Sequence, residues 1–312
     1  MGLGQQAILN LIYNDTTTYN SVLSEIDNLN AEKSDVNLEQ NATENKLTAK
    51  YSENNLLKQQ DNLQTNQLEE YHALLQETIE NEDPMNKMYC GIKEFVIEEA
   101  SMCGMGMGMG SLQLNSNLQL TGKELVAMDQ VLNSNSDGAM GVNCLVDKLH
   151  EMGIENAQVS KDGSEIELTR VDENGNETKV KFKDANGDGM LNGCDYDFSD
   201  ALAKFNEDLK AYNEKVAMLE ENIEITSNQL QATKAAENSV SNDIKALEET
   251  KQAQKDKLSS IDNKIKENEA KAKEFEKNIA SLNQQYEETK NEAEIEEENQ
   301  EQKLEKDEEE DT

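Results

Sequence analysis

The chain has 312 residues, of which 35% are hydrophobic, with one proline and no tryptophan. Globular domains are usually about 45–50% apolar, so this chain cannot bury a core in proportion to its length. Its formal net charge of −36 disfavours nucleic acids and anionic membrane surfaces as partners, because their negative groups are bound by Lys and Arg. No stretch approaches the ~18 apolar residues of a membrane span.

The start of the chain, residues 1–32, contains no Lys or Arg. A secretory signal peptide begins with a positively charged segment, which this sequence lacks. We therefore expect a cytoplasmic protein, or one that is exported without a cleaved signal peptide.

Residues 5–82 are predicted to form one long helix whose apolar side chains follow a seven-residue repeat. Two positions of each repeat, called a and d, face a partner helix in a coiled coil. The residues that fit these two positions include Ile12, Tyr19 and Ile26 at a, and Val22, Leu29 and Val36 at d. The only proline, Pro84, is expected to end this helix.

Residues 84–198 differ from the flanking helices and are predicted to form a separate α+β head. The helical spacing of apolar residues over 85–101 predicts a second helix. The segment 102–110, MCGMGMGMG, then alternates Met and Gly. Its sulfur atoms are soft ligands that suit Cu(I), although a low-complexity connector is the simpler interpretation.

Two short helices and a pair of strands are expected further along the head. A capping box, Thr121–Glu124, predicts a helix over 123–132, and another helix is expected around 142–152. Residues 156–183 alternate like strands, and Asn174-Gly175 between them is a strong signal for a hairpin turn.

The stretch Asp184–Asp195, DANGDGMLNGCD, places side-chain oxygens at every second position from its start. Asp184, Asn186 and Asp188 supply them, and Gly189 follows where a sharp turn needs a residue without a Cβ. Ca²⁺ takes about 6–8 oxygens, which a 12-residue loop supplies from positions 1, 3, 5, 7, 9 and 12. The stretch resembles an EF-hand-type calcium loop.

This resemblance implies a Ca²⁺ site whose ligands are Asp184, Asn186, Asp188, the Met190 carbonyl, Asn192 through a water, and Asp195. Position 12 is Asp rather than Glu, and a strand rather than a helix precedes the loop, as in dockerin-type and strand–loop–helix variants. Dockerins carry two such repeats and this chain has one good copy, so cohesin binding is not implied. A turn rich in Asn, Asp and Gly that holds no metal is the alternative.

An earlier stretch, Asn133–Cys144, resembles a degenerate EF-hand between the two short helices. Positions 1, 3, 5 and 6 are Asn133, Asn135, Asp137 and Gly138. Position 12 is a cysteine, so no carboxylate closes the ligand shell. Because affinity follows the charge of the ligands, we expect no calcium binding here at physiological concentrations.

The rest of the head offers no catalytic group. The simplest interpretation of its four cysteines is free thiols in a reducing compartment, and a disulfide or a shared zinc site are the alternatives. These cysteines are Cys90, Cys103, Cys144 and Cys194. The sequence has no phosphate-binding glycine motif, no metalloprotease motif and no nucleophile elbow. We therefore predict that the protein is not an enzyme.

Residues 199–293 keep one heptad register throughout, which predicts a second coiled-coil helix, and residues 294–312 form an acidic tail that we expect to be frayed or disordered. This helix is expected to fold back on residues 5–82. The expected register sets Leu47 opposite Val240, Leu57 opposite Leu230 and Lys50 opposite Glu237, and leaves residues after about Leu282 without a partner.

The sequence thus predicts a mainly α protein, a long antiparallel coiled-coil hairpin with a small α+β head that carries an EF-hand-like calcium loop. We expect a non-enzymatic, calcium-binding structural or adaptor protein, in which calcium rigidifies the junction of head and stalk and the head binds a protein partner. The alternative is a secreted effector or surface adhesin that presents the head on the stalk.

Overall fold

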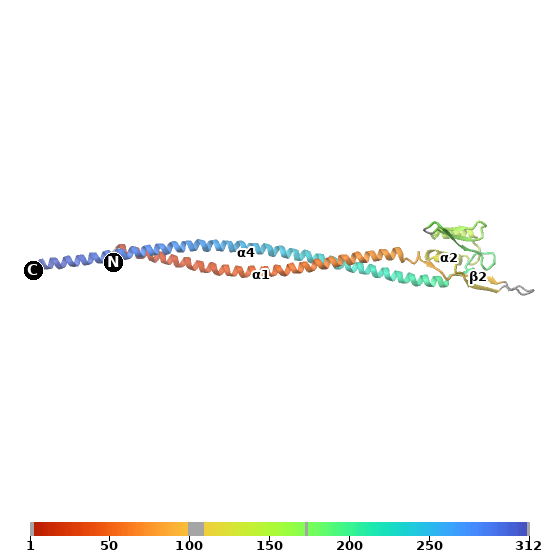
Figure 1. The fold of residues 1–312 in the computed structure, drawn as a ribbon, viewed down its shortest axis with the longest axis horizontal. Helices are drawn as coiled ribbons and strands as arrows, with labels where there is room; N and C mark the ends of the chain where they lie inside the picture. Colours follow the sequence, from red (N-terminus) through yellow and green to blue (C-terminus); the bar gives the residue numbers. More distant parts are fainter. Residues whose placement is uncertain (1–2, 99–108, 172–173, 311–312) are drawn as a thin grey trace, which may run out of the picture. The chain divides into compact units, whose positions relative to one another are not determined.

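The computed structural model describes residues 3–98, 109–171 and 174–310 (Figure 1). The protein is mainly helical, with small antiparallel sheets, which confirms the predicted mainly α chain with a small α+β part. It divides into two compact units. Unit 1 comprises Met1–Asp61 and Ala232–Thr312, and unit 2 comprises Asn62–Gln231.

Two long helices, α1 (Leu3–Asn81) and α4 (Ser199–Glu310), make up most of the chain and contribute to both units. As predicted, α1 ends just before the Asp83-Pro84 pair. The acidic tail expected to be frayed after residue 293 is instead helical up to Glu310. Glu and Lys are good helix formers, and ion pairs between successive turns, such as Lys290–Glu294, add to their propensity.

Unit 2 contains the shorter elements, between the end of α1 and the start of α4. These are β1 (Met88–Tyr89), β2 (Lys93–Glu98), β3 (Met109–Leu114), β4 (Leu120–Thr121), α2 (Gly122–Ser134), α3 (Val142–Glu151), β5 (Ala157–Val159), β6 (Ile166–Val171), β7 (Glu177–Phe182) and β8 (Tyr196–Asp197). In the described residues the strands pair as β1-β4, β3-β2-β8 and β5-β6-β7, all antiparallel.

The helix predicted over 85–101 is wrong, because its described residues form β1 and β2. Gly91 lies between these strands with φ +98°, a left-handed conformation that interrupts a helix. The residues after it, KEFVIE, are rich in β-branched and aromatic side chains, and β2 pairs with strands on both edges. The tertiary pairing overrides the helical spacing.

The Met-Gly segment lies largely outside the described residues, and its last two residues begin β3. Gly110 has a structural reason to be glycine, since a Cβ there would collide with the ring of Phe95 on the paired strand β2. The prediction of a copper site or connector over 102–108 is untested by the structure.

The capping box at the start of α2 is confirmed. The Glu124 amide donates to Thr121 Oγ1 at 3.2 Å, and the Thr121 amide donates to Glu124 Oε2 at 2.9 Å.

The apolar faces of α2 and α3 pack on β6 and β7 in one core, which includes the fully buried Leu125, Met128, Leu145, Leu168 and Phe182. The start of α4 joins this core through Ala201 and Phe205.

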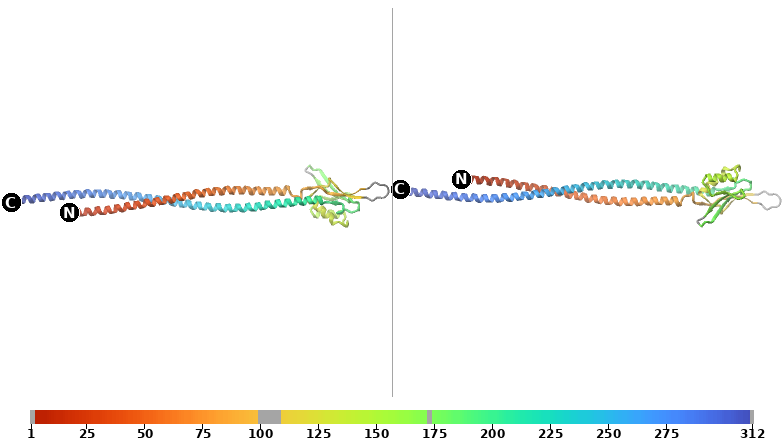
Figure 2. Two further views of the ribbon diagram at one scale, coloured as in Figure 1. Left: turned by 90° about the horizontal axis from the view of Figure 1, so that it is seen from below. Right: turned by 90° about the horizontal axis from the view of Figure 1, so that it is seen from above.

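In unit 1, segments of α1 and α4 lie side by side in the views of Figures 1 and 2. They share two buried apolar clusters, Leu29, Val36, Ile261 and Ile265 in one, and Leu47, Val240 and Ile244 in the other. Ion pairs flank the clusters: Glu32–Lys257, Lys33–Asp262, Glu44–Lys251 and Lys50–Asp243. Higher residue numbers in α1 are paired with lower numbers in α4.

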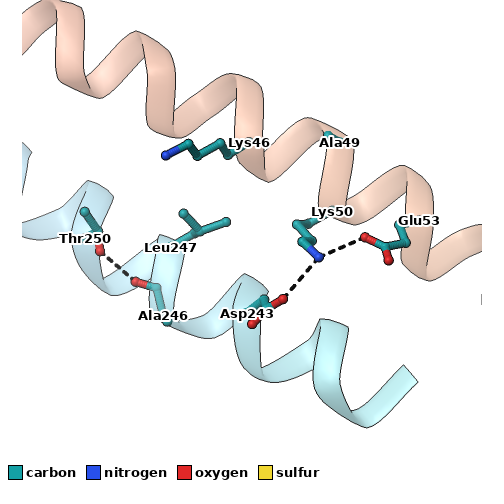
Figure 3. A pocket seen from close by; sticks show the side chains of 8 residues that line it. All are labelled: Lys46, Ala49, Lys50, Glu53, Asp243, Ala246, Leu247 and Thr250. Carbon is teal, nitrogen blue, oxygen red and sulfur yellow. Dashed lines mark hydrogen bonds and ion pairs between the residues drawn. The ribbon is translucent and has the colours of Figure 1, made fainter. Parts of the chain in front are cut away.

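The predicted pairing of Lys50 with Glu237 is wrong. The Lys50 ammonium lies 3.1 Å from Asp243 and 3.0 Å from Glu53 of its own helix. Figure 3 marks both ion pairs. The expectation of no partner after Leu282 is also wrong, since the Gln5 side chain donates to the Thr289 carbonyl at 3.3 Å. These contacts fit a register about one heptad away from the predicted one.

Candidate calcium-binding loop

The loop Asp184–Asp195 connects β7 to β8 in unit 2, and the chain enters α4 directly afterwards. Tyr196 closes the base of this loop. Its hydroxyl accepts from the Lys183 amide at 3.0 Å and donates to the Lys183 carbonyl at 3.2 Å, while its ring meets Phe182 edge-on at 5.0 Å. Burial raises the pKa of Tyr196.

Asp195, at position 12, is fully buried and holds the two ends of the loop together. Its Oδ1 accepts from the amides of Ala185 at 2.8 Å and Asn186 at 3.0 Å, and its Oδ2 accepts from the Asn192 amide at 2.8 Å. A buried carboxylate that accepts three backbone N–H groups is well compensated for its loss of water.

The first half of the loop is a series of turns around the predicted ligands. Asp184 accepts from the amides of Gly187 at 2.7 Å, Asp188 at 3.2 Å and Gly189 at 2.6 Å. Asn186 Oδ1 accepts from the Asp188 amide at 2.8 Å. Gly189 has φ +86°, which confirms a left-handed turn at position 6, where only glycine fits without strain.

The second half of the loop is less exposed. The Asp188 carboxylate accepts from the Met190 amide at 2.9 Å, and the Met190 side chain is 40% exposed. Asn192 is buried, and its Oδ1 accepts from the Cys194 amide at 2.7 Å. The Asp195 carboxylate therefore faces the start of the loop, whereas the Asn192 oxygen bonds the turn that follows it.

A carboxylate of this loop can bind a calcium ion only if it has an oxygen lone pair that no backbone amide occupies. An ionised carboxylate has about four lone-pair sites. Asp184 and Asp195 each use three of them on backbone amides, so each retains one, whereas Asp188 uses one. With the Asn186 oxygen, the Met190 carbonyl and waters, these groups would supply as many oxygens as a Ca²⁺ ion takes.

No group of three His, Cys, Asp or Glu side chains arranged to hold a metal occurs in the described ranges. The carboxylates of Asp184, Asp188 and Asp195 are therefore not gathered there into such a group. Cys90, Cys144 and Cys194 are free and exposed, and Cys103 lies outside the described residues. A disulfide among those three is therefore absent.

The structure brings the degenerate loop Asn133–Cys144 against the candidate loop, which the sequence analysis missed. Asn135 is fully buried, and its Nδ2 donates to the Leu191 carbonyl at 2.8 Å. The EF-hand template assigns Asn135 to a ligand position, and nothing in one sequence distinguishes a ligand from a buried structural amide. Tyr196 was also missed, although a Tyr directly after position 12 is visible in the sequence.

None of the helices in the described part of the chain is both long and apolar enough to cross a membrane. A comparison of the chain with protein-family models, with curated proteins and with solved structures found no match in any of the three.

Proposed function

We propose that the protein is a non-enzymatic, calcium-binding structural or adaptor protein, and that the loop Asp184–Asp195 is its calcium site. The observation that carries this proposal is the conformation of the loop. Side-chain oxygens alternate at positions 1, 3 and 5, the glycine at position 6 has positive φ, and the position 12 carboxylate is buried against the start of the loop. These features match the template of a 12-residue calcium loop, which has ligands at positions 1, 3, 5 and 12 and a glycine at position 6.

Calcium would act at the junction between the sheet β5-β6-β7 and the start of α4. The loop leaves β7 and, through β8, leads into the first turn of α4, whose Ala201 and Phe205 lie in the same core. The carboxylates of Asp184, Asp188 and Asp195 repel one another when no cation is present. A bound ion would remove this repulsion and hold α4 firmly to the core of unit 2.

The proposal also includes a coiled-coil hairpin made by α1 and α4 of one chain. The apolar clusters and ion pairs of unit 1 support it, because a and d residues of both helices are buried together and charged residues flank them. Such a helix pair supplies a scaffold and no reactive group. A protein partner of unit 2 would complete the adaptor role.

Calorimetric titration with Ca²⁺ tests the calcium site. Wild-type protein should bind one ion, and Asp188→Ala should weaken binding at least about tenfold, because affinity follows the number of charged ligands. Asp188 is exposed, so its removal should disturb the fold less than removal of Asp184.

The matched control is Asp162→Ala. Asp162 is also an aspartate in a tight turn of unit 2, where it accepts from Ser160 and Ser164. This variant should bind calcium as the wild type does. Absence of binding by the wild type at millimolar calcium would refute the proposed site, and a stoichiometry of two would refute the expectation that Asn133–Cys144 does not bind.

A further inference from the structure

Asn135 is a fully buried amide at the C-terminal end of α2, and all of its hydrogen-bonding atoms inside the core are engaged. Its Oδ1 accepts from the Met140 amide at 2.8 Å. Its Nδ2 donates to the Met140 carbonyl at 3.1 Å and to the Leu191 carbonyl at 2.8 Å. One side chain thus joins the segment before α3 to the candidate calcium loop.

The contact falls on the half of the loop that carries the less exposed ligands. Leu191 lies between Met190, whose carbonyl is a proposed ligand, and Asn192, which follows at position 9. The Leu191 carbonyl shares one planar peptide with the Asn192 amide, and this amide donates to Asp195 Oδ2 at 2.8 Å. A hydrogen bond that fixes the Leu191 carbonyl therefore also fixes the amide that holds the Asp195 carboxylate at position 12.

Two glycines bring the segments together around this bond. A Cβ on Gly138, which has φ +67°, would collide with the side chain of Met190, and a Cβ on Gly193 would collide with Asn133. Leu191 itself is buried in the core of unit 2, and Met140 packs against that core. The two segments are therefore packed closely enough for a small displacement of one to be transmitted to the other.

We propose that Asn135 is a positioning residue for the calcium loop, and that the segment Asn133–Cys144 is a brace that holds the Leu191–Asn192 peptide, and through it the Asp195 carboxylate, in place. This inference rests on the proposed calcium site. The brace does not itself take a metal, because the Asn135 side chain is occupied by Met140 and Leu191. Second-sphere groups that orient metal ligands typically contribute about 10–100-fold to metal affinity.

The variant Asn135→Asp distinguishes a brace from a ligand. Aspartate retains an acceptor for the Met140 amide but loses the two donors, and it places a carboxylate oxygen against the Leu191 carbonyl. A brace predicts calcium binding to Asp184–Asp195 that is weaker by about tenfold or more, with one ion per chain. If Asn135 were instead a ligand at position 3 of a second site, the new carboxylate should tighten calcium binding or allow a second ion to bind.

The control variant is Glu124→Gln, which removes a buried charge from the same unit at a distance from the loop in sequence and in its contacts. Circular dichroism at the titration temperature first establishes that each variant is folded. Unchanged calcium affinity in folded Asn135→Asp, or an equal loss in folded Glu124→Gln, would overturn the proposal. Because the wild type is titrated alongside, absence of any calcium binding would instead refute the site itself.

Hydrogen exchange of the wild-type protein gives a test that needs no variant. The Met140 amide donates to Asn135, whereas the Thr169 amide donates to the Asn156 carbonyl in the sheet of β6. Saturating calcium should slow exchange of the Met140 amide by a larger factor than that of Thr169, because only Met140 is linked to the loop. Equal slowing of both amides would mean general stabilisation and would contradict the brace.

Discussion

Arg170 is the only arginine in the chain, and its guanidinium joins β6 to the start of α2. It donates to both carboxylate oxygens of Glu124, with Nε 3.2 Å from Oε1, and to the Gln119 carbonyl at 2.7 Å. Asn156 adds a donor to the same carboxylate at 3.0 Å. A planar guanidinium suits this two-point contact, which an ammonium group cannot reproduce.

This cluster should make the stability of unit 2 depend on pH. Burial by itself would raise the pKa of Glu124, but hydrogen bonds from Arg170, Asn156 and the Thr121 amide outweigh burial and lower it. A carboxylate whose pKa is lower in the folded state stabilises the fold above its unfolded pKa of about 4.3. That contribution is lost as the pH falls through the lower, folded-state pKa.

Glu124→Gln should therefore lower the free energy of unfolding at pH 7 by about 1–3 kcal/mol, the usual range for a hydrogen-bonded charged group. In urea titrations at a series of pH values, the difference from wild type should shrink as the pH falls below about 4. Glu207→Gln is the control, since the Glu207 side chain is 73% exposed and its ion pair with Lys204 should contribute little. A pH-independent difference would contradict the assignment to the charge of Glu124.

At the scale of elements, the register between α1 and α4 depends on a few charged residues. A shift of one heptad leaves every a and d residue in the seam, so the apolar repeat alone hardly distinguishes the two registers. The register expected from the sequence pairs two charged residues within the seam between the helices, Lys50 and Glu237. In the structure Lys50 instead reaches a carboxylate flanking the seam, Asp243, and the side chain of Glu237 has a buried oxygen without a partner.

A pair of engineered cysteines should distinguish the two registers. Leu47 lies between two ion pairs that join the helices, Glu44–Lys251 and Lys50–Asp243. Leu47 therefore lies opposite Leu247. In a background without the native cysteines, Leu47→Cys with Leu247→Cys should form a disulfide within one chain on mild oxidation. Leu47→Cys with Val240→Cys is the matched pair, displaced by one heptad or about 10 Å, which is too far for a disulfide.

Gel electrophoresis without reductant gives the outcome of both oxidations. Preferential cross-linking of Leu47 to Val240 positions would support the register expected from the sequence. Cross-linking between chains would refute the hairpin within one chain.

The elements with strong local signals were predictable, and those that depend on contacts were not. The capping box of α2, the hairpin β6–β7 and the end of α1 before Pro84 each follow from a few adjacent residues. Strand β2 was mistaken for a helix because its partners, β3 and β8, are distant in sequence. The candidate calcium loop is recognisable as a turn from its own residues, whereas its contact with Asn135 joins positions 56 residues apart.

At the scale of the whole molecule, paired aromatic side chains and helical residues are distributed differently. The paired aromatic rings, Tyr89, Phe182, Tyr196, Phe198 and Phe205, all belong to unit 2. The two long helices, by contrast, contain most of the helical residues and run through both units. Near-ultraviolet circular dichroism therefore reports mainly on unit 2, whereas the far-ultraviolet signal reports on both units.

Calcium should raise the unfolding temperature seen in the near ultraviolet more than that seen in the far ultraviolet. A ligand at about 100 times its dissociation constant stabilises the state that binds it by about 2.7 kcal/mol, which corresponds to several degrees for a domain of ordinary size. The net charge of −36 means that any salt also stabilises the fold by screening repulsion, so the comparison is made with NaCl at equal ionic strength. Asp188→Ala, which should bind calcium more weakly, should show a smaller shift than the wild type. If calcium shifts both signals equally, or shifts Asp188→Ala as much as the wild type, its effect is general screening of the acidic chain and not occupation of the loop.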